Sequence, residues 1–219
     1  MDIFLQQTIN GLTVGGIYAL IALGYTMVYG VLRLINFAHG DLSVLGAYVG
    51  LVVLSSGAGG GTTLLVVLAF VAAVVVVGLA GAALEFTAYR PLRKADRLAA
   101  VVSALGASLL IENGIMLIWG PQLRVFPQGL LPSGAWEAAG TRIDLLQVLI
   151  IGGSALLMAL LYLFVHHTRF GTAMRAAAID QDAARLMGIN VNRVITSVFV
   201  IGPALGAIGG LFIGLYYRQ

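Results

Sequence analysis

The sequence predicts an all-α polytopic membrane protein with about six transmembrane helices, the second of them short or discontinuous. Hydrophobic residues make up 60% of the 219 positions, and charged residues only 10%. Several apolar runs approach the roughly 20 residues that a helix needs to cross a bilayer core about 30 Å thick. We therefore expect one transmembrane domain over residues 1–219.

Six apolar runs define the expected helices. Leu42–Leu54 has 13 residues and would rise only about 20 Å, so it must extend back through the polar residues before it or form a half-helix. The first run has no basic segment before it and is too long for a signal peptide, so we expect it to remain as a span. The five runs that can span are Phe4–Leu32, Thr62–Phe86, Leu98–Trp119, Ile143–Val165 and Val194–Tyr217.

The basic residues indicate the orientation. Nine fall on one side of the expected spans and three on the other, and such an excess marks the cytoplasmic side. The amino terminus and Gln219 are then expected outside. A sequence pI near 9.4 does not indicate a nucleic acid partner, because these residues lie in short loops. The nine are Arg33, Arg90, Arg93, Lys94, Arg97, Arg169, Arg175, Arg185 and Arg193, and the three are Arg124, Arg142 and Arg218.

Glycines at intervals of four predict close helix packing. Small residues let helix backbones approach each other in lipid, where apolar bulk does not drive association. The alternative is that glycine is simply more frequent in membrane helices. The expected stripe is Gly202, Gly206, Gly210 and Gly214 in the last span, and Gly11 with Gly15 begins a similar one in the first.

A polar interruption before the second helix is a candidate substrate pathway. It contains Asn36, Phe37, His39 and Asp41, and we expect Asp41 to cap the following helix. Irregular backbone at membrane depth is tolerated only where protein buries it or where it lines a cavity, and transporters bind substrates at such breaks. An ordinary cytoplasmic turn is the alternative, which the nearby Arg33 favours.

Two carboxylates lie inside apolar runs. Glu85 is close enough to the end of its span to find a partner at the interface, so we expect a structural role. Glu112 lies deeper, beside Asn113, and an ionisable group inside the membrane is a candidate pathway residue. A hydrogen bond between helices is the alternative for Glu112.

Residues 168–193 form a polar, alanine-rich segment between two apolar runs, and we expect it to dock a soluble protein. A helix is expected from Thr172, as its cap, to Met187, before Gly188. Mixed charges make this helix less suited to lying on lipid, which is the alternative. Its expected apolar stripe is Ala176, Ile179, Ala183, Leu186 and Met187, and the opposite side carries Arg175, Gln181, Asp182 and Arg185.

Four stretches resemble the LivH-type permeases of bacterial branched-chain amino acid ABC transporters. They are residues 10–20 (NGLTVGGIYAL), 35–41 (INFAHGD), 88–93 (AYRPLR) and 171–190. The resemblance covers nearly the whole chain in order. Family members continue past the position of Tyr217 with further spans, so we expect this chain to be a truncated form.

The resemblance implies the partners and the location. Residues 171–190 correspond to the family's coupling element, which receives the ATP-binding subunit, so Arg175, Ile179, Asp182, Ala183, Arg185 and Leu186 are its expected contacts. A second, related permease subunit and a periplasmic substrate-binding protein are also implied. The chain would lie in the bacterial inner membrane.

The expected function is substrate transport by alternating access, powered by ATP hydrolysis in a separate subunit. The sequence has no Gly-x-x-x-x-Gly-Lys-Ser/Thr pattern and Lys94 is its only lysine, so we expect it to bind no nucleotide cofactor and to be no enzyme. The absence of cysteine excludes thiolate metal sites, and no metal is expected.

Two other functions stay open on the residues alone, namely an ion-coupled secondary transporter and a membrane scaffold that transports nothing. The residues also do not separate branched-chain amino acids from urea or short amides.

Overall fold

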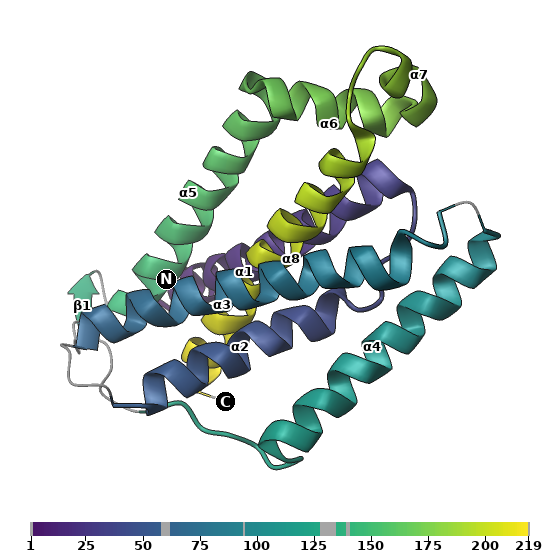
Figure 1. Ribbon diagram of the computed structural model, residues 1–219. Coiled ribbons are helices and arrows are strands. Elements are labelled where there is room, and N and C mark those ends of the chain that lie inside the picture. The colour runs from purple at the N-terminus through teal and green to yellow at the C-terminus, as the bar shows by residue number, and fades with distance from the viewer. Residues whose placement is uncertain (1, 58–61, 94, 128–134, 139–140, 219) are drawn as a thin grey trace.

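The computed structural model describes residues 2–57, 62–93, 95–127, 135–138 and 141–218, most of them helical (Figure 1). Lys94 and Gln219, which the sequence assigned to sides of the membrane, lie outside this part. The elements in order are α1 (Asp2–Leu32), α2 (His39–Ser55), α3 (Thr62–Leu84), the π-helix η1 (Glu85–Tyr89), α4 (Arg97–Trp119), β1 (Ala135–Ala138), β2 (Thr141–Asp144), α5 (Leu145–His167), α6 (Arg169–Ile179), α7 (Gln181–Leu186) and α8 (Val191–Tyr217).

The helices confirm the expected fold class. Within the described residues, five helices are long and apolar enough to cross a membrane, and α2 is a shorter apolar helix. At 17 residues α2 rises about 26 Å, slightly less than the thickness of a bilayer core. It begins at His39, so it takes up the last residues of the polar interruption.

Helix α8 is the centre of the bundle. It packs against α1, α2 and α3, and Figure 1 shows it crossing between them. In its most apolar stretch 78% of the residues are buried, whereas the corresponding value is 11% in α4 and in α5. Those two helices therefore flank the bundle and expose most of their apolar surface.

Small residues bring α8 against its neighbours. A Cβ atom at Gly210 would overlap the backbone carbonyl of Ser43 in α2, and one at Gly202 would lie 2.7 Å from the carbonyl oxygen of Gly24 in α1. The stripe predicted in the last span is therefore a packing surface. The stripe predicted in the first span does not pack within this chain, because no atom of the described residues lies within 4 Å of a Cβ at Gly11 or Gly15.

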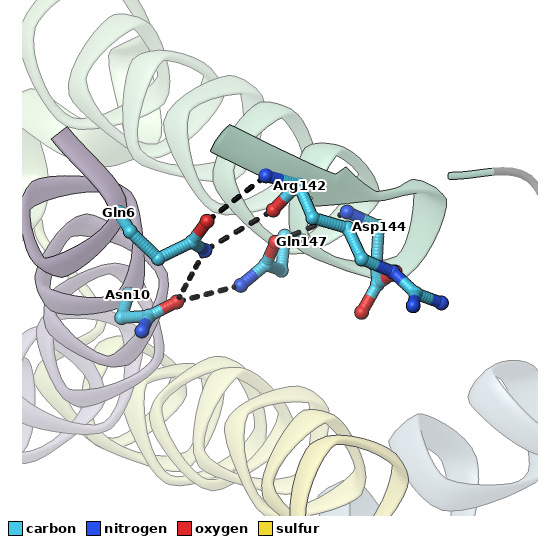
Figure 2. Close-up of polar contacts among 5 residues, drawn as sticks. All are labelled: Gln6, Asn10, Arg142, Asp144 and Gln147. Atoms are coloured by element: carbon cyan, nitrogen blue, oxygen red, sulfur yellow. Dashed lines mark hydrogen bonds and ion pairs between the residues drawn. The ribbon is translucent and has the colours of Figure 1, made fainter. Parts of the chain in front are cut away.

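A polar network joins α1 to α5 at the end of the bundle that holds the amino terminus. Figure 2 shows the Gln6 side chain paired with the backbone of Arg142, whose N–H donates to Gln6 Oε1 (3.0 Å) and whose carbonyl accepts from Gln6 Nε2 (3.1 Å). Gln147 Nε2 donates to Asn10 Oδ1 at 2.9 Å, and its Oε1 accepts from the Asp144 N–H. Strands β1 and β2 form an antiparallel hairpin directly before α5. The network fixes the start of α5 against α1.

We predict that Gly210→Ala destabilises the protein, because the new methyl group must displace the α2 backbone at Ser43. Overpacking of this kind costs about 1–3 kcal/mol. The melting temperature of the purified protein in detergent should fall relative to wild type. Gly106→Ala in α4 is the matched control, because its Cβ would lie within 4 Å of no atom in the part of the chain that the structure describes. Equal melting temperatures for the two variants would contradict the packing described for α8.

Candidate functional site

The connection between α1 and α2 turns back into the bundle. His39, the first residue of α2, places Nε2 3.1 Å from the backbone oxygen of Ile21. Ile21 precedes the end of α1 by eleven positions, which is about 16 Å along the helix. On the other side, the His39 ring faces Gly206 in the middle of α8. The polar interruption therefore lies deep between α1 and α8, and not in a turn at the end of the helices.

Asn36 and His39 are buried polar residues with unused hydrogen-bonding groups. Each is 2% exposed. Asn36 Oδ1 accepts from the Tyr89 hydroxyl at 3.0 Å, but Asn36 Nδ2 and His39 Nδ1 have no hydrogen-bond partner among the described residues. If His39 is neutral and its Nε2–H donates to Ile21, Nδ1 is an acceptor. Buried polar groups are nearly always satisfied in proteins, so this free donor and acceptor mark a place where a polar ligand could bind.

The other two residues predicted in the interruption lie differently. Phe37 is 42% exposed and points out of the buried cluster. Asp41 is in the first turn of α2 and accepts a hydrogen bond from the Ser108 hydroxyl of α4. The prediction that Asp41 caps α2 is wrong, because the cap position is Ala38 and no side chain caps it. The Asp41 carboxylate instead forms a hydrogen bond to α4.

An apolar cavity of about 340 Å³ adjoins the interruption. Gly40 and Ser43 of α2 line it near the buried polar residues, and Phe126 and Gly214 line it toward the amino-terminal end of the bundle. Phe126 is 4% exposed, and its N–H donates to the Arg218 carbonyl at 3.2 Å. The cavity is thus lined by α1, α2, α8 and residues 123–126, and Asn36 and His39 lie beside it without lining it.

Glu112 and Asn113 are not part of this site. Both are exposed on α4, which flanks the bundle, and Asn113 Nδ2 donates to the carbonyl of Leu109 one turn earlier at 2.7 Å. The structure does not bring them near Asn36 or His39, although the sequence grouped all four as pathway candidates.

A buried ion pair lies at the end of the bundle away from the amino terminus. The sequence predicted that Glu85 has a partner there but did not identify it. Glu85 is fully buried and pairs with Arg93, and its other oxygen accepts from the Thr196 hydroxyl of α8 at 2.9 Å. Arg93 also donates to Asn192 Oδ1 at 2.7 Å. The expected interfacial partner of Glu85 is therefore Arg93. The pair fixes η1, from which Tyr89 reaches Asn36.

The segment after α5 forms two short helices instead of the single helix expected from Thr172 to Met187. Helix α6 is capped by Thr168, whose hydroxyl accepts from the Gly171 N–H at 2.9 Å. The helix is interrupted at Asp180, whose carboxylate accepts hydrogen bonds from the Asp182 and Ala183 N–H groups and caps α7. The strong capping preference of aspartate competes here with helix continuation.

The break also divides the predicted apolar stripe. Met174, Ala177 and Ala184 face inward and are buried. Of the residues predicted to contact a partner, Arg175 and Ala183 are exposed, and Asp182 pairs with Arg185 at 2.9 Å on the surface. Three large apolar side chains stand outward, with exposed fractions of 78% for Ile179, 88% for Leu186 and 82% for Met187.

The chain matches the family described as the permease component of the branched-chain amino acid transport system over residues 7–219. It is 41% identical to the permease protein BraD of a high-affinity branched-chain amino acid transport system of Pseudomonas aeruginosa, over 98% of this chain and 72% of that protein. The corresponding LivH of Escherichia coli K12 is also 41% identical, over 98% and 71%. No solved structure matches.

A more distant relative is found in an archaeon. The probable branched-chain amino acid transport permease LivH of Methanocaldococcus jannaschii is 28% identical, over 87% of this chain and 60% of that protein. The chain therefore belongs to the branched-chain amino acid transport permease family and is a multi-pass membrane protein.

We predict that Arg93→Ala destabilises the protein strongly, because it leaves Glu85 buried without its countercharge. Breaking a buried pair in this way costs about 3–5 kcal/mol. Arg142→Ala is the control: its pair with Asp144 is largely exposed, so about 1 kcal/mol or less is expected, and the backbone bonds to Gln6 remain. Unfolding by increasing SDS in mixed micelles compares the two. A larger effect for Arg142→Ala would contradict the assignment.

Proposed function

We propose that the chain is the membrane permease of an ATP-driven importer of branched-chain amino acids, with the substrate passing the start of α2. The supporting observation is the buried donor and acceptor at Asn36 and His39 beside an apolar cavity of about 340 Å³. An aliphatic amino acid needs hydrogen-bonding groups for its charged ends and apolar space for its side chain. Ligand sites typically combine few polar groups with an apolar lining in this way.

The basic residues support an orientation with the amino terminus outside. Arg33, Arg93 and Arg185 lie at the end of the bundle that carries α6 and α7, whereas Arg142 and Arg218 lie at the other end. The excess of basic residues supports a cytoplasmic location of the α6 end. The bacterial relatives BraD and LivH support the bacterial inner membrane as the location. The cavity then lies on the periplasmic side of the polar cluster.

The ATPase subunit is proposed to dock on α6 and α7. Exposed Ile179, Leu186 and Met187 are large apolar side chains on a segment outside the spans, with Arg175, Asp182 and Arg185 beside them. Apolar groups clustered on a water-facing surface, with charges around them, are typical of a protein contact. ATP is bound by that subunit. This chain is a conduit without a cofactor or catalytic activity of its own, and a second related permease and a periplasmic binding protein complete the transporter.

The test is reconstitution with those partner subunits in liposomes. Labelled leucine should enter when ATP is supplied to the ATPase side, and unlabelled isoleucine and valine should compete, whereas urea and short amides should not. An ionophore should leave uptake intact while ATP remains. Uptake that collapses with the ionophore would instead indicate an ion-coupled transporter, and the absence of any flux would indicate a scaffold.

We predict that Asn36→Ala and His39→Ala each reduce leucine uptake by roughly 10-fold or more. Each substitution removes a buried polar group, and a buried group that loses its hydrogen-bond partner costs about 1–3 kcal/mol. Amounts of inserted complex should stay near wild type, as quantified in membranes by immunoblotting. His166→Ala is the matched control, because this histidine is exposed at the end of α5. Unchanged uptake in both variants would remove these residues from the pathway.

A further inference from the structure

Arg33 ends α1 in a backbone conformation that favours glycine. Its φ is 54°, and its N–H donates to the Tyr29 carbonyl at 2.7 Å, which closes the last turn of α1. Glycine is the usual residue at such a left-handed position after a helix, because it has no Cβ to clash. An arginine in this place therefore suggests that its side chain has a role.

The Arg33 side chain caps a different helix. Its guanidinium donates from Nη2 to the backbone oxygens of Ala178 and Ile179, both at 3.2 Å. These are the last carbonyls of α6, and carbonyls at a helix end lack partners within the helix. A positive charge is also favoured at that end by the helix dipole. Glycine could supply neither contact.

A second polar contact joins the same two segments. Gln181, the first residue of α7, donates from Nε2 to the Val31 carbonyl in the last turn of α1 at 3.1 Å. A cavity of about 330 Å³ lies between Val31–Arg33 and Ala177–Gln181. The two segments are therefore joined here by a few hydrogen bonds with open space around them. We use the name Arg33 clamp for the side chains of Arg33 and Gln181 together with the backbone carbonyls that they bind, which are those of Val31, Ala178 and Ile179.

The electrostatics at the clamp agree with this geometry. The backbone amides of Ala183 and Asp182 lower the pKa of Asp180, and the positive charge of Arg33 lowers it further. The guanidinium thus binds the end of α6 and lies near enough to the Asp180 carboxylate to influence it, without forming an ion pair with it in the described residues.

The clamp leads directly to the buried polar cluster. Asn36 follows Arg33 by three residues and His39 by six, with irregular backbone between Arg33 and α2. The cluster is held from the other side by the bond between Tyr89 and Asn36. A shift of α6 and α7 would pull on the chain that carries Asn36, while η1 holds its side chain.

We propose that Arg33 is a positioning residue that transmits movement of the α6–α7 segment to the substrate pathway. This inference rests on the proposed function. It assigns to Arg33 the link between ATP hydrolysis and substrate movement, so a transporter without the clamp should hydrolyse ATP while moving less substrate.

The experiment measures leucine uptake and ATP hydrolysis in the same proteoliposomes, with the whole transporter and its binding protein. Arg33→Gly removes the guanidinium and keeps a residue suited to the left-handed backbone. We expect the leucine taken up per ATP hydrolysed to fall about fivefold, within the range known for residues that couple distant sites. Hydrolysis should persist. Gln181→Leu, which loses the amide but keeps a similar volume, should lower the ratio in the same direction.

Arg90→Ala is the matched control, because it removes an arginine near the same end of the bundle. The Arg90 guanidinium lies 5.4 Å from the Phe86 ring centre. Arg90 lines a cavity together with Phe170 of α6, but within the described residues no hydrogen bond or ion pair joins its side chain to α6 or α7. Its uptake per ATP should equal wild type. An unchanged ratio in Arg33→Gly, or equal losses of uptake and hydrolysis, would overturn the inference.

Two further outcomes are also decisive. If Arg33→Gly does not assemble, Gln181→Leu decides, and an unchanged ratio there overturns the inference. A wild-type transporter that takes up no leucine with ATP refutes the proposed function itself, which separates that failure from a failure of the clamp.

Discussion

The close approach of α8 to its neighbours is the constraint on which the rest of the structure depends. Helices in lipid are not driven together by apolar surface, so close association must come from backbone contact and interhelical hydrogen bonds. Gly202 and Gly210 give α8 that contact with α1 and α2. Because Gly206 also leaves room for the His39 ring, α2 can begin in the middle of the bundle. A larger residue there would displace the polar cluster.

The deep start of α2 joins two regions that are distant in sequence. Tyr89 of η1 reaches Asn36 from one side, and Arg33 of the same connection holds the end of α6 on the other. The ion pair of Glu85 with Arg93 fixes η1 against α8. The α6–α7 segment is thus connected to the polar cluster through the hydrogen bonds of Arg33 and the short stretch of backbone from Arg33 to Asn36, as the proposed coupling to a separate ATPase would require.

Composition and periodicity were enough to predict the spans, the short second helix and the glycine surface of α8, because these depend on length and residue size along one helix. The break at Asp180 was missed because local capping outweighed the helical pattern. Contacts across the bundle could not be predicted, because the partners are distant in sequence. Asp41 accepts a hydrogen bond from Ser108, and Arg33 caps α6. Glu112 was grouped with the polar interruption before α2 because both are polar, but polarity does not indicate the direction in which a side chain points.

In the proposed mechanism, the α6–α7 segment lies on the cytoplasmic side and receives the force that moves the substrate past α2. The chain has no cysteine, so single cysteines placed at Arg175 and at Arg185 can be labelled without background. In intact cells and in inverted vesicles, a membrane-impermeant thiol reagent should label both positions only when it is added to the cytoplasmic face. Labelling of both positions from the periplasm would show that α6 and α7 lie on the wrong side of the membrane to receive an ATPase subunit.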